Sequence, residues 1–224
     1  SMTSHIKTTR FWLAWIFASL LVYPLVAIFL IALTMVLSPI LTAVAPSYSY
    51  YDSGATLETV YMIGFIVGIG GVVGFAVGLL QKTVIKRYFH FTVYSWQRTT
   101  AIGGMIAAPV MALAIHGMTR ALSDNYWQFY ESGYYSPLSS IIAVMPMVIY
   151  VTVLSAIQVV ILRRYVSHAW LWILANTTAG MMFSMLVNSA YEPHVGNWIL
   201  AAIAQGAVTG FAMLWLLHNL NKEL

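Results

Sequence analysis

Six long apolar segments constrain the fold of this chain more than any other feature of its sequence. A helix needs about 20 apolar residues to cross the hydrocarbon core of a bilayer. The segments that qualify are residues 11–38, 59–81, 99–118, 138–162, 169–188 and 197–218. Their apolar runs are continuous, whereas membrane-spanning strands alternate apolar and polar residues. The sequence therefore predicts an all-α integral membrane protein with six transmembrane helices.

The composition agrees with lipid as the main solvent. Of the 224 residues, 61% are hydrophobic and only 7% are charged, against about 25% charged residues in soluble domains. We expect a single transmembrane domain, residues 1–224, without an appended soluble domain. Residues 11–38 are too long for a cleaved signal peptide and are interpreted as the first span. The absence of cysteine excludes disulfides, thiolate catalysis and thiolate metal sites.

Basic residues gather on one side of the predicted topology. That side holds Lys7, Arg10, Lys82, Lys86, Arg87, Arg98, Arg163, Arg164 and Lys222. The other side holds only Arg120. Because cytoplasmic loops carry an excess of Lys and Arg, we expect a multi-pass protein of the bacterial cytoplasmic (inner) membrane with both termini in the cytoplasm.

Residues 46–58 and 119–137, on the outer side, are rich in tyrosine and other aromatic residues. Aromatic side chains are enriched at membrane–water interfaces, so we expect these two segments to lie against the outer surface as interfacial loops. The alternative is an aromatic, acidic mouth that receives a ligand or a partner.

An internal repeat appears when the chain is shifted by 77 residues. The identical pairs are Gln81 and Gln158, Arg87 and Arg164, Tyr88 and Tyr165, Thr100 and Thr177, Gly103 and Gly180, and Met105 and Met182. Each copy contains an inward-running helix with a glutamine near its inner end, a basic pair, an aromatic turn and an outward-running helix. We expect two repeat units, at residues 59–118 and 138–188.

A third unit is expected in split form, from residues 197–218 and 11–38. In the first part, Val208, Gly210, Phe211 and Ala212 match Val72, Gly74, Phe75 and Ala76. In the second, Trp12, Leu13, Trp15 and Ile16 match Trp170, Leu171, Trp172 and Ile173 with one gap. Three hairpin units would then surround a pseudo-threefold axis along the membrane normal.

The stretch from Gln158 to Arg164 resembles a motif of uncharacterised bacterial multi-spanning membrane proteins, the repeated Gln-Trp-x-x-Leu-Arg-Arg. Val159 stands where that group often has tryptophan, and the stretch from Gln81 to Arg87 matches with Lys82 and Lys86 substituted. The resemblance covers about half the chain. It implies a polytopic membrane fold and supplies no activity.

Five glycines of the second segment are spaced to lie on one side of a helix: Gly64, Gly68, Gly71, Gly74 and Gly78. Small residues let transmembrane helices approach closely, so we expect this face to pack against a neighbouring helix. A smooth-walled conduit, or a groove for a lipid or pigment, is the alternative.

The deep polar residues that could bind a ligand are Asn176, Thr177, Gln205 and Thr209. Neutral amides inside a bundle most often bond a neighbouring helix, and the alternative is a small polar or lipid-binding site lined by Asn176 and Gln205. No charge falls at mid-membrane, which argues against a proton-driven transporter or pump.

The basic pairs at the inner face, Lys86-Arg87 and Arg163-Arg164, lie where anionic lipid head groups would be. We expect them to fix the topology, and binding of a lipid or a cytoplasmic partner is the alternative. Nucleic-acid binding is not expected, because the basic loops are too short to form a broad patch.

No metal site is predicted, although His116, His194 and Glu192 on the outer side could together hold a metal ion. Haem is not expected, because the histidines fall at helix ends or in loops. Catalytic motifs are absent, so no catalytic residue is assigned, an enzyme is not the favoured interpretation, and the cofactor is unknown.

The leading interpretation is a non-enzymatic polytopic membrane protein. It would be a subunit of a membrane complex or a protein that binds a lipid or another hydrophobic ligand, with membrane lipids, other subunits or a second copy of itself as partners. The alternative is a small-solute transporter or channel. Polar groups that converge on one cavity would favour transport, whereas a flat glycine face without a partner helix would favour a subunit.

Overall fold

The computed structural model describes residues 2–44, 54–89, 95–131, 137–188 and 194–218, which form six α-helices and no strands. The helices are α1 (Met2–Val44), α2 (Gly54–Phe89), α3 (Trp96–Glu131), α4 (Pro137–Leu162), α5 (Leu171–Asn188) and α6 (Val195–His218). Each contains a stretch that is long and apolar enough to cross a membrane. The prediction of an all-α protein with six such helices is confirmed.

Three helices run well beyond the predicted apolar segments, and one of them is α1, which spans Met2–Val44 where residues 11–38 are expected. Helix α3 continues through residues 119–131, and α2 begins at Gly54, so parts of both aromatic segments expected as loops are helical instead. No glycine or proline interrupts residues 118–131, and the breakers Gly133 and Pro137 come only afterwards. Residues 46–53 and 132–136 of these segments lie outside the described residues.

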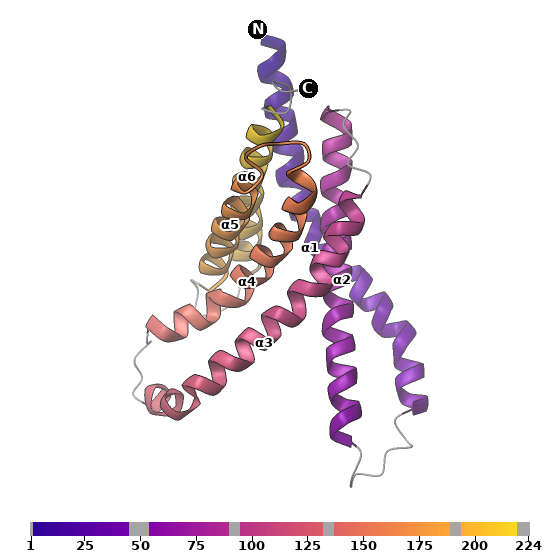
Figure 1. Ribbon diagram of the computed structural model, residues 1–224, viewed down its shortest axis with the longest axis vertical. Helices are drawn as coiled ribbons and strands as arrows, with labels where there is room; N and C mark the ends of the chain where they lie inside the picture. The colour runs from indigo at the N-terminus through magenta and orange to yellow at the C-terminus, as the bar shows by residue number, and fades with distance from the viewer. Residues whose placement is uncertain (1, 45–53, 90–94, 132–136, 189–193, 219–224) are drawn as a thin grey trace.

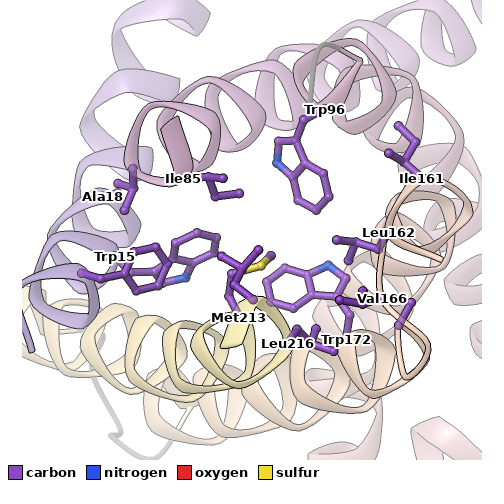
Figure 2. Packing of buried hydrophobic residues seen from close by; sticks show 14 residues of the cluster. Trp15, Ala18, Ile85, Trp96, Ile161, Leu162, Val166, Trp172, Met213 and Leu216 are labelled. Carbon is purple, nitrogen blue, oxygen red and sulfur yellow. The ribbon is translucent and has the colours of Figure 1, made fainter. Parts of the chain in front are cut away.

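The helices form a ring in chain order. Each helix contacts the one before and the one after it, and α1 closes the ring against α6. Figure 2 shows this ring with large apolar side chains filling its centre. A ring of this kind can enclose a space that every helix lines.

The two ends of the ring differ in charge and in width. The end where α1 begins and α6 ends is called here the basic end, because most of the described basic side chains lie there: Lys7, Arg10, Lys82, Lys86, Arg87, Arg98, Arg163 and Arg164. The helices converge at the basic end and diverge toward the opposite, far end (Figure 1).

Interior prolines fall in three of the helices, Pro24 and Pro39 in α1, Pro109 in α3 and Pro146 in α4. A proline removes one helical hydrogen bond and bends the helix.

Glycines bring α2 and α3 into backbone contact near the middle of the bundle. A Cβ atom on Gly70 would collide with the carbonyl oxygen of Gly104, and one on Gly104 would collide with the carbonyl oxygen of Gly70. A Cβ on Gly74 would collide with the carbonyl oxygen of Thr100, and Cβ atoms on Gly71 and Gly78 would each come within 2.9 Å of an α3 side chain. Gly64 and Gly68 take no part in this packing, since no other group lies within 4 Å of the Cβ position of either. Toward the far end, α2 has therefore separated from α3.

A core of buried aromatic and aliphatic side chains closes the ring at the basic end. Its largest members are Trp15, Trp96 and Trp172, each no more than 1% exposed, together with Phe11 and Met213. The indole of Trp172 contacts those of Trp15 and Trp96, with ring centroids 6.1 and 6.4 Å apart. Figure 2 shows the three indoles pointing into the ring from α1, α3 and α5.

Candidate ligand-binding site: a cavity inside the helix ring

The ring encloses a cavity of about 500 Å³ that is lined by side chains from all six helices. Its floor lies at the basic end, beside Trp15, Gln81 and Gln158. From there it extends to Ala143 in α4 and Asn188 in α5. At 1.5 Å of rise per residue, this corresponds to about 20 Å of helix length, a large part of a hydrocarbon core about 30 Å thick. Volumes of 300–1,000 Å³ are usual for small-molecule sites.

A network of neutral hydrogen bonds builds the floor. The indole nitrogen of Trp172 donates to Gln158 Oε1 at 2.7 Å, and that of Trp96 donates to Gln81 Oε1 at 3.1 Å. Gln158 Nε2 donates to Gln81 Oε1 at 3.2 Å and to Thr100 Oγ1 at 3.0 Å. The two glutamines thereby join α2, α3, α4 and α5. All three acceptors are uncharged, so the network adds no charge to this apolar region.

The third indole is held by a different acceptor. Trp15 Nε1 in α1 donates to Thr209 Oγ1 in α6 at 3.1 Å. Each of the three tryptophans also accepts a hydrogen bond at its carbonyl oxygen from the side chain four residues later. The donors are Ser19 at 3.0 Å, Thr100 at 2.7 Å and Asn176 at 2.8 Å. Helices α1, α3 and α5, which all run from the basic end toward the far end, thus carry the same local arrangement at the floor.

Above the floor the walls are mainly apolar. Three aromatic rings from α1, α5 and α6 form one wall: Tyr23 stacks on Phe183 with centroids 5.5 Å apart, and Trp198 packs against both at 6.4 and 5.7 Å. The hydroxyl of Tyr23 donates to Gln205 Oε1 at 3.0 Å, and that of Tyr150 donates to the Gly70 carbonyl at 3.4 Å. Among the described residues, none that lines the cavity is charged.

Three of the four deep polar residues singled out from the sequence line this cavity. Asn176, Gln205 and Thr209 all contribute to it, from α5 and α6. Thr177 does not, and its hydroxyl instead lies 2.8 Å from that of Thr152 across the α4–α5 contact. Sequence reasoning did not place Gln81 and Gln158 at the site, although both marked the internal repeat. Each glutamine precedes a tryptophan by 15 or 14 residues, and an indole N–H can donate to a glutamine oxygen. This recurrence is the signal that could have found them.

The remaining candidates lie elsewhere. His116 and His194 are exposed, and Glu192 is outside the described part of the chain. No group of three metal-binding side chains occurs among the residues whose positions are described. Lys86, Arg87, Arg163 and Arg164 are exposed at the basic end, below the floor of the cavity.

Chemically, the arrangement can hold an elongated apolar molecule and offer it uncharged hydrogen-bonding groups at one end. It contains no nucleophile activated by a base and no paired carboxylates among the lining residues. Comparison of the chain with protein-family models, with curated proteins and with solved structures finds no match.

Proposed function

We propose that this protein is a non-enzymatic, multi-pass membrane protein that binds a lipid-like or other hydrophobic ligand within its ring of helices. The observation that carries the proposal is the cavity, which all six helices line and whose walls are mainly apolar. Apolar clefts with a few convergent polar groups are the usual form of small-molecule sites.

Membership of a larger complex is less well supported. The glycine face of α2 that a partner helix would have used is occupied by α3 along Gly70, Gly74 and Gly78. Membrane lipids remain the partners we propose first, and association with other subunits or with a second copy is secondary.

Transport of a small solute is the second candidate function. It is favoured by the convergence of Gln81, Gln158, Asn176 and Gln205 on one cavity. Transport would require the tryptophan floor to open, because the described core closes the basic end. Release of a bound ligand to both sides of a reconstituted vesicle would support this function, and release to one side only would exclude it.

We further propose that the protein lies in a bacterial inner membrane with both termini in the cytoplasm. The support is the separation of charge, since eight basic side chains lie at the basic end and seven of them are exposed there. Positive charge marks the cytoplasmic side of membrane proteins.

We also propose that the helices form three related hairpins, α2–α3, α4–α5 and α6–α1. What supports this is the recurrence of one pattern, a tryptophan of the outward-running helix that donates to a polar side chain of the inward-running helix. Gln81 and Trp96 are 15 residues apart, and Gln158 and Trp172 are 14 residues apart. A shift of 77 therefore aligns the two glutamines, and a shift of 76 aligns the two tryptophans. The third hairpin would use Thr209 in place of glutamine.

The experiment that tests ligand binding compares two alanines of α4. Both alanines are exposed, but Ala143 lines the cavity and Ala156 does not. In Ala143→Trp the new indole would occupy the cavity, so the ligand that co-purifies with the gently solubilised wild-type protein should be lost. Ala156→Trp should retain it.

The readout is native mass spectrometry, which gives both the occupancy and the mass of the bound molecule. Wild-type protein without any bound molecule, or equal retention by the two variants, would contradict the proposal. Thermal unfolding of both variants in the same detergent shows whether each is folded.

A further inference from the structure

Tryptophan chemistry fixes the orientation of two amides at the floor of the cavity. An indole N–H can only donate, so the side-chain atom that it meets must be an oxygen. Trp96 and Trp172 therefore assign Oε1 of Gln81 and Oε1 of Gln158 as acceptors. The Nε2 group of Gln158 is then fully used, with one bond to Gln81 and one to Thr100.

The Nε2 group of Gln81 is in a different position. Its oxygen accepts two hydrogen bonds, but within the described part of the chain its NH₂ group has no hydrogen-bond partner. Gln81 lines the cavity and is partly exposed. It therefore supplies N–H donors to whatever occupies the floor.

Asn176 supplies the complementary group. Its Nδ2 donates to the carbonyl oxygen of Trp172, which can only accept, so this bond fixes the orientation of the amide. Its Oδ1 has no donor among the described residues, and Asn176 lines the cavity one helical turn above Trp172. Gln205 lies one turn above Thr209. Its amide can take either orientation, because the hydroxyl of Tyr23 that bonds to it can donate or accept.

We infer that the ligand's head group lies on the floor, and that it is an uncharged group that both accepts and donates hydrogen bonds, as a primary amide or a hydroxyl does. This inference rests on the proposed ligand-binding function. The donors of Gln81 and the acceptor of Asn176 recognise the head, and the mainly apolar walls above them hold the chain of the ligand. A charged head is rejected there, because no lining side chain among those described carries a compensating charge.

Four probes that share one apolar chain test the head group. They are oleamide, oleyl alcohol, and the same chain carrying a sulfonate or a trimethylammonium group, each titrated into detergent-solubilised protein and followed by native mass spectrometry. The amide and the alcohol should bind at least about tenfold more tightly than either charged probe, since an uncompensated charge is costly to desolvate.

The same titration in the Asn176→Leu variant tests whether Asn176 binds the head group. The affinity for oleamide should fall about fivefold, the factor that corresponds to one neutral hydrogen bond, while the affinities for the charged probes should not change. Thr178→Leu is the matched control, because Thr178 is exposed on the same helix and does not line the cavity. This control should bind oleamide as the wild type does.

Equal binding of charged and neutral probes, or an unchanged affinity for oleamide in Asn176→Leu, would overturn the inference and indicate that the apolar end of the ligand enters first. If Ala143→Trp still abolished binding in that case, the proposed function would stand without the inference. Binding of no probe, or binding that Ala143→Trp leaves unchanged, would contradict both.

Discussion

At the scale of single residues, the floor of the cavity shows how a buried indole is accommodated without charge. Trp172 is fully buried, and its N–H group finds an acceptor at 2.7 Å in Gln158, which is itself only 1% exposed. A buried donor left without an acceptor costs about 1–3 kcal/mol. A carboxylate in place of the glutamine would have to carry its charge into an apolar core, which is far more costly. A neutral amide accepts the indole hydrogen bond and brings no charge into the core.

Removal of that donor should destabilise the protein. In Trp172→Phe, the Oε1 atom of Gln158 loses the one hydrogen bond that it accepts within the described part of the chain, and the smaller ring fills the core less completely. We expect the free energy of unfolding to fall by about 2 kcal/mol. Trp170→Phe is the control, because Trp170 is 52% exposed, and it should change stability by less than about 0.5 kcal/mol. Equal losses in the two variants, measured by denaturant unfolding in mixed micelles, would show that the buried bond is not stabilising.

At the scale of helices, the pairing of α2 with α3 depends on backbone contact rather than on interlocking side chains. The hydrophobic effect gives little drive for association inside a bilayer, so close approach is how two helices gain contact energy there. Gly70 and Gly104 make this approach possible, and each is buried. Pro109 follows within two turns of Gly104, beyond the last glycine contact of the two helices.

A side chain at this crossing should separate the helices. We expect Gly104→Leu to lower the free energy of unfolding by about 3 kcal/mol, because the new atoms would occupy the space of the Gly70 carbonyl and neither backbone can yield cheaply. Gly68→Leu is the matched control on α2, since nothing lies within 4 Å of its Cβ position. That control should be neutral or slightly stabilising, as leucine favours helix more than glycine does. Thermal unfolding followed by light scattering distinguishes the two, and a larger loss in the control would contradict the assignment.

At the scale of the whole molecule, the end of the bundle that carries most of the positive charge is also its narrow end. The narrow end carries nearly all of the described basic side chains, and the wide end carries Arg120. If the basic end faces the cytoplasm, the cavity extends away from it toward the outer leaflet. A ligand would then enter from the outer half of the membrane or from the outer surface.

The chain offers a direct test of this orientation, because it contains no cysteine. Ser167→Cys places a thiol on an exposed position between α4 and α5, and His194→Cys places one before α6 at the far end. A membrane-impermeant maleimide should label the His194→Cys variant in intact cells, and the Ser167→Cys variant only after permeabilisation. The reverse pattern would place the basic end outside.

The number and type of the helices could be predicted because each one carries its own signal, a run of apolar residues as long as the bilayer is thick. Their ends were less predictable. Helix α3 continues through residues 119–131, where polar and aromatic residues sustain a helix without raising hydropathy. Spacing alone does not show where two helices diverge, so it groups Gly64 and Gly68 with the glycines that pack against α3.

The cavity itself was not predictable from the sequence. Asn176, Gln205 and Thr209 could be identified as deep polar residues, since each interrupts an apolar segment. Gln81 and Gln158 stand near basic pairs at the ends of their segments, and the sequence marks them only as members of the internal repeat. Their role depends on the ring order of the helices, which places two residues 77 positions apart within hydrogen-bonding distance.

The contact between Gly70 and Gly104 has a mechanical consequence. From Gly78 to Gly70, α2 lies against α3, so the far arms of the two helices can separate only beyond this last contact. Gln81 and Trp96 lie on the basic side of this contact, and Met111, which lines the cavity, lies on the far side. Spreading the far arms around a bulky occupant would therefore leave the floor in place, because α2 and α3 are already in contact on that side along Gly74 and Gly78. The size of what enters would then be accommodated at the far end alone, and the hydrogen-bonded floor would keep one arrangement for ligands of different width.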